Sequence, residues 1–214
     1  MAVTVTIGAD EVGYGTLAGP LVAAAVAYTQ SSTPPAVISH GRTVVVKDSK
    51  KISAVVLPKL AKEIATFCAA CEVHAFRAKD VDTWGAEVAK HQILRTVIQR
   101  LLERLQNKFG EDVVTRIIVD GDTNLQPCSF IYEAIPRADD TFWEVSAASV
   151  LAKHYQVRAM EDLHREFPHY GWDQNHGYGT AAHMAALKKH GVTAHHRRSY
   201  APIRKLLPME GLED

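Results

Sequence analysis

The sequence predicts a mixed α/β fold, in which a sheet is flanked by helices and followed by a helical C-terminal segment. Two patterns support this prediction. Apolar runs typical of strands open the chain, and helical and strand-like patterns then alternate along it. A basic stretch with helical periodicity closes the chain, and no internal repeat or low-complexity linker interrupts the sequence. At 214 residues the chain is long enough to bury a sizeable core.

The first strands are expected near the N-terminus. Residues 3–9 alternate between apolar and polar side chains, and residues 20–28 form a short apolar run after a Gly-Pro turn. Residues 43–47 resemble a third strand, and residues 72–77 resemble a fourth strand or an extended linker. Three strands joined by short turns suggest that the chain begins with an antiparallel meander.

Helices are expected through the rest of the chain. Apolar residues at helical spacing predict four of them, at residues 53–71, 85–107, 146–166 and 180–190. Pro58 favours a later start for the first helix, because proline fits only the first turn. The stretch "VVTRIIVDGD" reads as a buried strand that ends in acids, and a weaker strand is expected at residues 130–136.

The charge of the chain is zero overall but unevenly distributed. A bulk electrostatic argument for nucleic-acid binding therefore fails. Between Asp173 and Glu210, however, there is no acid, whereas the same interval holds six lysines and arginines and five histidines. Such a flank can bind a polyanion locally, or it can be an ordinary solvated surface.

We expect a cytoplasmic protein with no membrane segment. No apolar run approaches the roughly 20 residues that a membrane-spanning helix needs. The N-terminus does not resemble a signal peptide. Three cysteines fit a reducing compartment better than a disulfide framework, and the pair Cys68 and Cys71 is expected to serve in packing.

Residues 8–19, "GADEVGYGTLAG", place Asp10 and Glu11 together at the end of the first expected strand, ahead of several glycines. The glycine spacing matches a dinucleotide-binding loop. That loop must open a helix, whereas Gly19 and Pro20 interrupt this one before a strand-like run. The acid pair would also repel phosphate unless a cation intervened.

A second motif, "IIVDGDTN" at residues 117–124, resembles the Asp-x-Asp loop of phosphatases, in which the first acid attacks phosphorus. This interpretation leaves the pair Asp10 and Glu11 and the basic C-terminal stretch unexplained. A small-molecule phosphatase that uses Asp120 therefore stays an alternative.

Four acids lie at or just beyond expected strands, namely Asp10, Glu11, Asp120 and Asp139. Hard cations such as Mg²⁺ prefer oxygen ligands, and two such ions can assist phosphodiester hydrolysis. If the strand at 3–9 and the strand that ends at Asp120 are parallel neighbours, their carboxyl ends fall together. The pattern therefore favours a divalent metal site.

Taken in order, these motifs resemble the ribonuclease HII family (type 2 ribonuclease H) along nearly the whole chain. The matching segments are "GADEVGYGTLAGPLVAAAV", "KDSKKIS", "IIVDGD", "RADDTFWEVSAASVLAK" and "HGYGTAAHMAALKKHGVTAHHRRSYAP". The resemblance implies a ribonuclease H-like sheet flanked by helices. We expect residues 1–168 to form the catalytic core, with residues 169–214 packed on it as a basic, substrate-binding segment.

The resemblance also implies an activity, namely endonucleolytic cleavage of RNA in RNA–DNA hybrids and 5′ to a ribonucleotide embedded in duplex DNA. The products carry 3′-hydroxyl and 5′-phosphate ends, the cofactor is Mn²⁺ or Mg²⁺, with two ions when substrate is bound, and the protein is expected to be a monomer. Asp10, Glu11, Asp120 and Asp139 would be catalytic residues and metal ligands, with Asp140 as the runner-up for the fourth position.

Substrate contacts are implied for residues outside the acid set, namely Gly13, Tyr14, Gly15, Lys50, Tyr178, Arg197 and Arg198. The family triplet Gly-Arg-Gly reads the ribose 2′-hydroxyl largely through its backbone, and here its centre is Tyr14. The helix that follows "SAAS" carries Val157 where the family has an acid. These two departures leave a second alternative, a catalytically impaired protein that binds hybrids without cutting them.

Overall fold

The computed structural model describes residues 3–39, 41–46 and 52–208. Contacts group these residues into two compact units. The first unit comprises the described residues within 1–12, 22–75 and 90–155, and the second those within 13–21, 76–89 and 156–214. Two segments from the first half of the chain, residues 13–21 and 76–89, thus pack with the C-terminal residues.

A five-stranded mixed sheet forms the centre of the first unit, in the strand order β5-β2-β1-β6-β7. β1 is antiparallel to β2 and parallel to β6, and β6 is parallel to β7. The strands are β1 (Thr4–Val12), β2 (Leu21–Thr29), β5 (Ala70–Phe76), β6 (Val114–Asp120) and β7 (Glu133–Ile135). This arrangement confirms the expected mixed α/β fold.

The expected three-stranded meander is wrong in one respect. β1 and β2 do pair as an antiparallel hairpin, but the next strand does not join them. β4 (Arg42–Val45) pairs instead with β3 (Ala36–Ser39) in a separate two-stranded sheet. The place beside β2 is taken by β5, so the expected extended segment at 72–77 is an edge strand of the main sheet.

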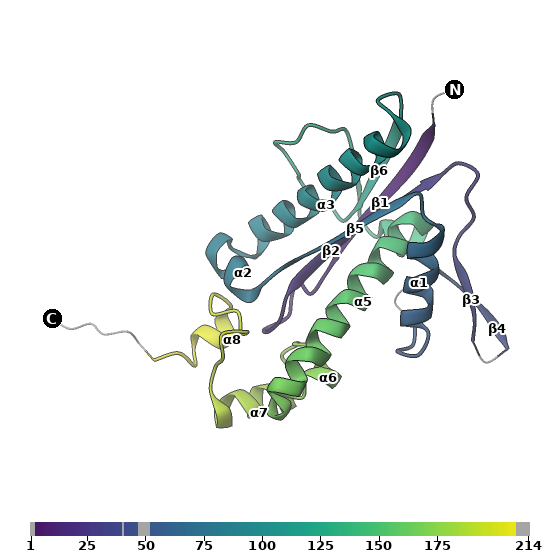
Figure 1. Cartoon of the computed structure of the whole chain (residues 1–214). Coiled ribbons are helices and arrows are strands. Elements are labelled where there is room, and N and C mark those ends of the chain that lie inside the picture. The colour runs from purple at the N-terminus through teal and green to yellow at the C-terminus, as the bar shows by residue number, and fades with distance from the viewer. Residues whose placement is uncertain (1–2, 40, 47–51, 209–214) are drawn as a thin grey trace. The chain divides into compact units, whose positions relative to one another are not determined.

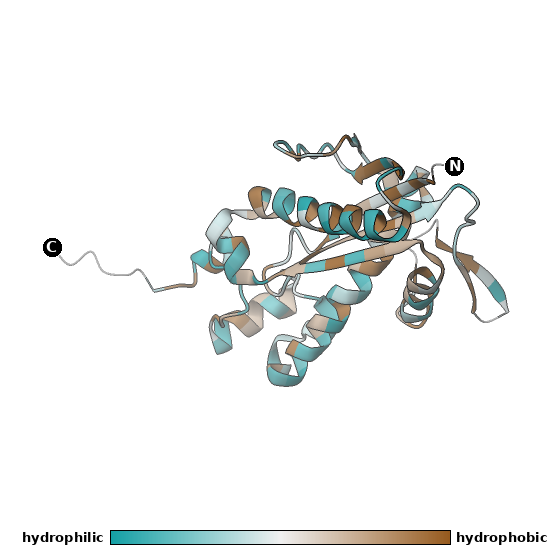
Figure 2. Cartoon of the chain, turned by 45° about the horizontal axis from the view of Figure 1, so that its top comes forward, coloured by the Kyte–Doolittle hydropathy of each residue, from teal (hydrophilic) through white to brown (hydrophobic). Residues whose placement is uncertain are grey.

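Helices cover both faces of the main sheet (Figure 1). α3 (Ala86–Phe109) lies on one face, whereas α1 (Leu57–Phe67) and α5 (Trp143–Glu166) lie on the other. Because both faces are covered, β2 is buried from Leu21 to Tyr28 without the alternation of a half-exposed strand. Figure 2 shows apolar residues along the strands and alternating polar and apolar bands along α3.

The start of α5 packs closely on β1, two residues before the first predicted metal ligand. A Cβ atom at Gly8 would lie 2.2 Å from the carbonyl carbon of Glu144, which is backbone and cannot move aside. Glycine at this position therefore lets helix and strand approach.

The second unit is built mainly from short elements around an aromatic core. These are α2 (Ala78–Trp84), a 3₁₀ turn at Pro168–Tyr170, α6 (Trp172–Asn175), α7 (Ala181–His190) and α8 (Ala201–Arg204). Tyr170 and Trp172 stack in the core with ring centroids 4.8 Å apart. Of the described helices, none is long and apolar enough to cross a membrane. The remaining helix, α4 (Ala138–Thr141), belongs to the first unit and follows β7.

Candidate active site

The pairing of β1 with β6 brings the first and third predicted metal ligands together. Ala9 is the register partner of Val119 in this parallel pair, so Asp10 and Asp120 follow side by side on neighbouring strands. Parallel strands end at the same edge of a sheet, so the condition set out from the sequence, that these two strands are parallel neighbours, is met. Asp10 is buried, and Asp120, the last residue of β6, is partly exposed.

Asp139 reaches the same edge from α4. Asp120 Oδ1 accepts a hydrogen bond of 2.7 Å from the backbone N–H of Ala138, the residue that precedes Asp139. Ser146 Oγ donates to the carbonyl oxygen of Asp139 at 2.5 Å, which connects this short helix to α5. We call the four side chains of Asp10, Glu11, Asp120 and Asp139 the carboxylate edge.

Burial and mutual repulsion disfavour the charged forms of two of these acids. Burial raises the pKa of Asp10 well above its usual value, and the negative charges of Glu11 and Asp120 raise it further. Burial also raises the pKa of Glu11, against the opposing effect of Lys90. A divalent cation would relieve both the burial cost and the repulsion, so these carboxylates are suited to one.

Asp10 and Glu11 point to opposite faces of the sheet, because consecutive residues of a strand do. Asp10 accepts hydrogen bonds from the hydroxyl of Ser149, on α5, and from the N–H of Glu11. Glu11 pairs instead with Lys90 on α3. In the described part of the chain, no three acid, histidine or cysteine side chains are already grouped as an ion site. The oxygen donors fit a hard divalent cation, and the negative charge of Asp120 acts on Glu11 as well as on Asp10.

The predicted substrate-binding glycine loop belongs to the second unit, and its backbone is held by the C-terminal segment. The carbonyl oxygen of Tyr14 accepts hydrogen bonds from Arg197 Nη1 at 2.8 Å and from the Tyr200 hydroxyl at 2.5 Å. Arg197 Nη2 donates to the carbonyl of Gly19 at 3.3 Å. The Tyr14 hydroxyl donates to Glu87 at 3.3 Å, whereas Gly15 is exposed.

Arg197 is completely buried, and burial lowers its pKa. Its guanidinium donates hydrogen bonds to carbonyl groups of the glycine loop. This arrangement favours a role in positioning that loop over direct contact with a phosphate. Arg198 is exposed, as a phosphate-binding side chain must be. Lys50, the other predicted cationic contact, lies outside the described residues.

Tyr178 is placed beside the glycine loop by its neighbour in the chain. The carbonyl of Gly177 accepts hydrogen bonds from the N–H groups of Leu17 at 2.8 Å and Ala18 at 3.3 Å. Tyr178 itself is 48% exposed. The second unit therefore brings together two of the predicted substrate-binding elements, the Gly13–Gly15 triplet and Tyr178, although they lie far apart in the sequence.

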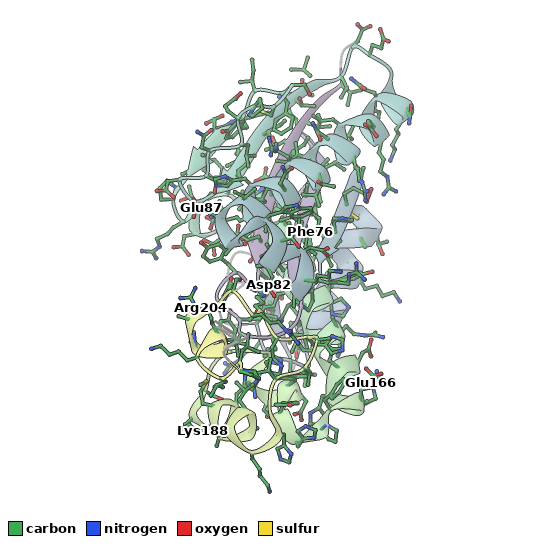
Figure 3. All side chains as sticks on the ribbon, turned by 90° about the vertical axis from the view of Figure 1, so that its left-hand side faces the viewer. Phe76, Asp82, Glu87, Glu166, Lys188 and Arg204 are labelled. Atoms are coloured by element: carbon green, nitrogen blue, oxygen red, sulfur yellow. The ribbon has the colours of Figure 1, made fainter. Side chains whose placement is uncertain are left out.

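Asp82 is a residue of this region that the sequence analysis did not identify. From α2 it accepts hydrogen bonds from the backbone N–H of Arg198 at 2.8 Å and of Ser199 at 2.9 Å. The Ser199 hydroxyl donates to the same carboxylate at 2.6 Å. Figure 3 shows Asp82 beside the C-terminal segment. Asp82 thus fixes the backbone at Arg198, and no local sequence pattern marks it.

A network of hydrogen bonds through His183 and His196 holds the backbone carbonyl of Tyr178. His183 Nδ1 donates to the carbonyl of Tyr178 at 2.9 Å, so His183 Nε2 is left as an acceptor for Trp172 Nε1 at 3.1 Å. The backbone N–H of Thr193 donates to His196 Nδ1 at 3.0 Å. His196 Nε2 must then carry its proton, which it donates to His183 Nε2 at 3.2 Å. The geometry requires both histidines to be neutral.

We expect the protein to lose stability as pH falls from about 6.5 towards 4, partly because of this network. Burial, followed by the charges of His183 and His195, lowers the pKa of His196 to about 4. In the unfolded chain this histidine has an ordinary pKa of about 6.5, so as pH falls it is protonated before the folded protein is. Acid therefore favours the unfolded state. A difference of about 2.5 pKa units at about 1.4 kcal/mol per unit sets an upper bound of about 3 kcal/mol at pH 4, and partial screening by solvent should reduce the loss to about 1–2 kcal/mol.

Urea unfolding at several pH values between 4 and 7 measures this effect. The variant His196→Gln should show a shallower dependence on pH, whereas the exposed control His169→Gln should follow the wild type. Equal slopes for the wild type and His196→Gln would contradict the assignment of neutral histidines to the network.

The substitution of Val157 for the family's acid leaves a half-buried apolar side chain on α5. Its neighbour Gln156 is buried and donates from Nε2 to the carbonyl of His176 at 2.9 Å. This bond ties α5 to the turn that leads to Tyr178, all within the second unit. The polar contact at this point of the helix is therefore made by Gln156, one residue before the expected acid.

Comparison with solved structures identifies the fold class of the chain. The chain superposes on the ribonuclease H2 from Pyrococcus horikoshii OT3 with a TM-score of 0.73 at 20% identity, covering 94% of this chain and 96% of that one. It superposes on Bst-RNase HIII in complex with Mn²⁺ with a TM-score of 0.67 at 19% identity, covering 96% and 70% of the two chains. The fold is therefore that of the ribonuclease H enzymes.

Sequence similarity identifies the family to which the chain belongs. The family model described as Ribonuclease HII matches residues 7–203. A relative from Rhodospirillum rubrum named Ribonuclease HII is 37% identical over 205 residues, covering 96% of this chain and 88% of the relative. The chain belongs to the ribonuclease HII family. It is accordingly an endonuclease of the kind that degrades the RNA of RNA–DNA hybrids by hydrolysing phosphodiester bonds.

Proposed function

We propose that the protein is a metal-dependent endonuclease that cuts the RNA strand of RNA–DNA hybrids and also cuts 5′ to single ribonucleotides embedded in duplex DNA. The products would carry 3′-hydroxyl and 5′-phosphate ends. The observation that carries the proposal is the carboxylate edge, where Asp10 and Asp120 lie side by side and Asp139 is tied to Asp120 through Ala138.

Asp10, Glu11, Asp120 and Asp139 would hold Mn²⁺ or Mg²⁺. Two such ions supply a Lewis acid and a water of lowered pKa for attack on phosphorus. A solved ribonuclease of the same fold contains Mn²⁺, which supports this choice of cofactor. The chain's own contribution is to bury Asp10 and to place Asp120 against the start of α4, so that the carboxylates are positioned before substrate arrives.

Substrate recognition is proposed for the second unit. The backbone of the triplet, buried at Gly13 and exposed at Tyr14 and Gly15, would read the ribose 2′-hydroxyl, the group by which a protein distinguishes RNA from DNA. The exposed ring of Tyr178 would pack on a neighbouring sugar, and Arg198 would contact a phosphate. Arg197 and Tyr200 support this surface because they fix the carbonyl of Tyr14. We also propose a monomeric, cytoplasmic enzyme.

Cleavage assays with and without metal test the proposal. A labelled DNA duplex that carries one ribonucleotide, an RNA–DNA hybrid and an all-DNA duplex are incubated with the protein in Mn²⁺, in Mg²⁺ and in EDTA. The two ribonucleotide-containing substrates should be cut with either metal, and cleavage should fall below detection in EDTA. The all-DNA duplex should stay intact throughout.

The two alternative functions predict different outcomes of the same assays. A catalytically impaired protein would bind the hybrid in a salt-sensitive manner without cutting it in any metal. A small-molecule phosphatase would hydrolyse a simple phosphomonoester and leave the duplexes intact. Either result would overturn the proposed endonuclease.

A further inference from the structure

Lys90 brings a positive charge to the carboxylate edge. It lies on α3 within the first unit, and its Nζ atom is 3.4 Å from Glu11 Oε1. The two side chains are only 18% and 13% exposed. A Cβ atom at Gly121, the residue after Asp120, would lie 3.5 Å from the same Nζ atom. The ammonium group therefore lies close both to Glu11 near the end of β1 and to Gly121 just beyond the end of β6.

The pair with Lys90 determines where the Glu11 carboxylate lies. Glu11 is directed to the face of the sheet that α3 covers, whereas Asp10 is directed to the face covered by α5. Burial raises the pKa of Glu11, and the charge of Lys90 opposes that effect. Among the described residues, the acids are not grouped as an ion site, although Glu11 is near enough to Asp120 for that negative charge to raise its pKa.

We infer that Lys90 is a positioning residue that holds Glu11 against α3 and competes with a divalent cation for its carboxylate. The inference rests on the proposed function, because it takes Glu11 to be a metal ligand. An ion that binds at Asp10 and Asp120 gains Glu11 only when that side chain leaves Lys90. The free protein should consequently bind metal more weakly than the same acids would without Lys90.

Binding of Mn²⁺ to the substrate-free protein tests this inference by isothermal titration calorimetry. The variant Lys90→Met should bind Mn²⁺ with a Kd about tenfold lower than the wild type, because one positive charge near the ligands has been removed. Lys90→Arg keeps the charge and should stay near the wild-type Kd. Lys59→Met changes net charge equally at an exposed position on α1 and should leave the Kd unchanged.

A second variant pair tests whether the tighter Mn²⁺ binding expected for Lys90→Met depends on Glu11. In a Glu11→Gln background, Lys90→Met should no longer tighten Mn²⁺ binding, because the carboxylate for which the two cations compete is absent. Lys90→Gln provides a polar replacement if the methionine variant does not fold. Thermal unfolding in EDTA adds a further readout, since Lys90→Met should lower Tm by leaving Glu11 buried and unpaired.

The possible outcomes separate the inference from the proposed function. A lower Tm in EDTA with an unchanged or higher Kd for Mn²⁺ would reduce Lys90 to a structural ion pair and overturn the inference, while cleavage by the wild type would still support the endonuclease. A wild-type protein that neither binds Mn²⁺ nor cuts ribonucleotide-containing duplexes would overturn both.

Discussion

Asp10→Asn should abolish cleavage and at the same time make the metal-free protein more stable. Replacement of the carboxylate removes a proposed metal ligand, and the rate should fall by on the order of 1,000-fold or more, because outer contacts of metal sites alone typically cost about 10–100-fold. The fold does not need this charge. Burial, together with Glu11 and Asp120, raises the pKa of Asp10, so its charged form is less favourable in the folded protein than in the unfolded chain.

The sign of the stability change follows from this raised pKa. A carboxyl group whose pKa is higher in the folded state destabilises that state above its unfolded value of about 4, where the unfolded chain has already released the proton. Asparagine keeps an oxygen that can accept from the Glu11 N–H and the Ser149 hydroxyl. Thermal unfolding in EDTA should therefore show a Tm a few degrees above that of the wild type.

Asp122→Asn is a matched control for this experiment. Asp122 is exposed and lies two residues beyond Asp120, in the "DGD" motif that would supply the acid or base of a phosphatase. In the proposed endonuclease it has no role, so cleavage and Tm should both stay near the wild type. Wild-type cleavage by Asp10→Asn, or a lower Tm in EDTA, would contradict the function assigned to Asp10.

The sequence predicted the two strands that lead to Asp10 and Asp120 because the signals for them are local. Alternation over residues 3–9 and the apolar run before Asp120 define two strands, and an acid follows at the end of each. What the residues alone could not supply was the pairing. The adjacency of β1 and β6 depends on contacts between segments more than 100 residues apart in the chain, and periodicity carries no signal for them.

The roles of Arg197 and Lys90 show where local patterns fail. Arg197 stands in a basic run, which predicts a solvated or phosphate-binding side chain, yet it is buried against the carbonyls of Tyr14 and Gly19. Lys90 stands in a helical pattern that gives no reason to single it out, yet it pairs with Glu11. In both cases the partner is remote in sequence, and only the folded backbone brings it near.

Gly177→Ala should both destabilise the second unit and displace Tyr178. The backbone φ angle of Gly177 is +86°, a conformation that costs other residues about 1–2 kcal/mol. A Cβ atom there would also lie 2.2 Å from the carbonyl oxygen of Ala18, so the backbone must move. Together these effects should cost at least about 2 kcal/mol, or about 4–8 °C in Tm for a chain of this size.

The functional consequence follows from the hydrogen bonds that the same residue makes. The carbonyl of Gly177 accepts hydrogen bonds from the N–H groups of Leu17 and Ala18. A shift of this backbone therefore moves Tyr178 away from the glycine loop. Cleavage 5′ to a single ribonucleotide, which depends on recognising one junction, should therefore fall more than the affinity for duplex, which depends on dispersed phosphate contacts. Thermal unfolding, duplex binding and cleavage are measured on the same preparation.

Gly15→Ala separates the two effects, because it changes the predicted substrate-reading loop without straining the fold. No atom lies within 4 Å of a Cβ at Gly15, and the residue does not adopt a positive φ angle. Its Tm should equal that of the wild type, while the added methyl group obstructs the approach of a ribose and lowers cleavage. If Gly177→Ala retained the wild-type Tm, the close contact with Ala18 would not exist in solution, and Tyr178 would have to be positioned by the histidine network alone.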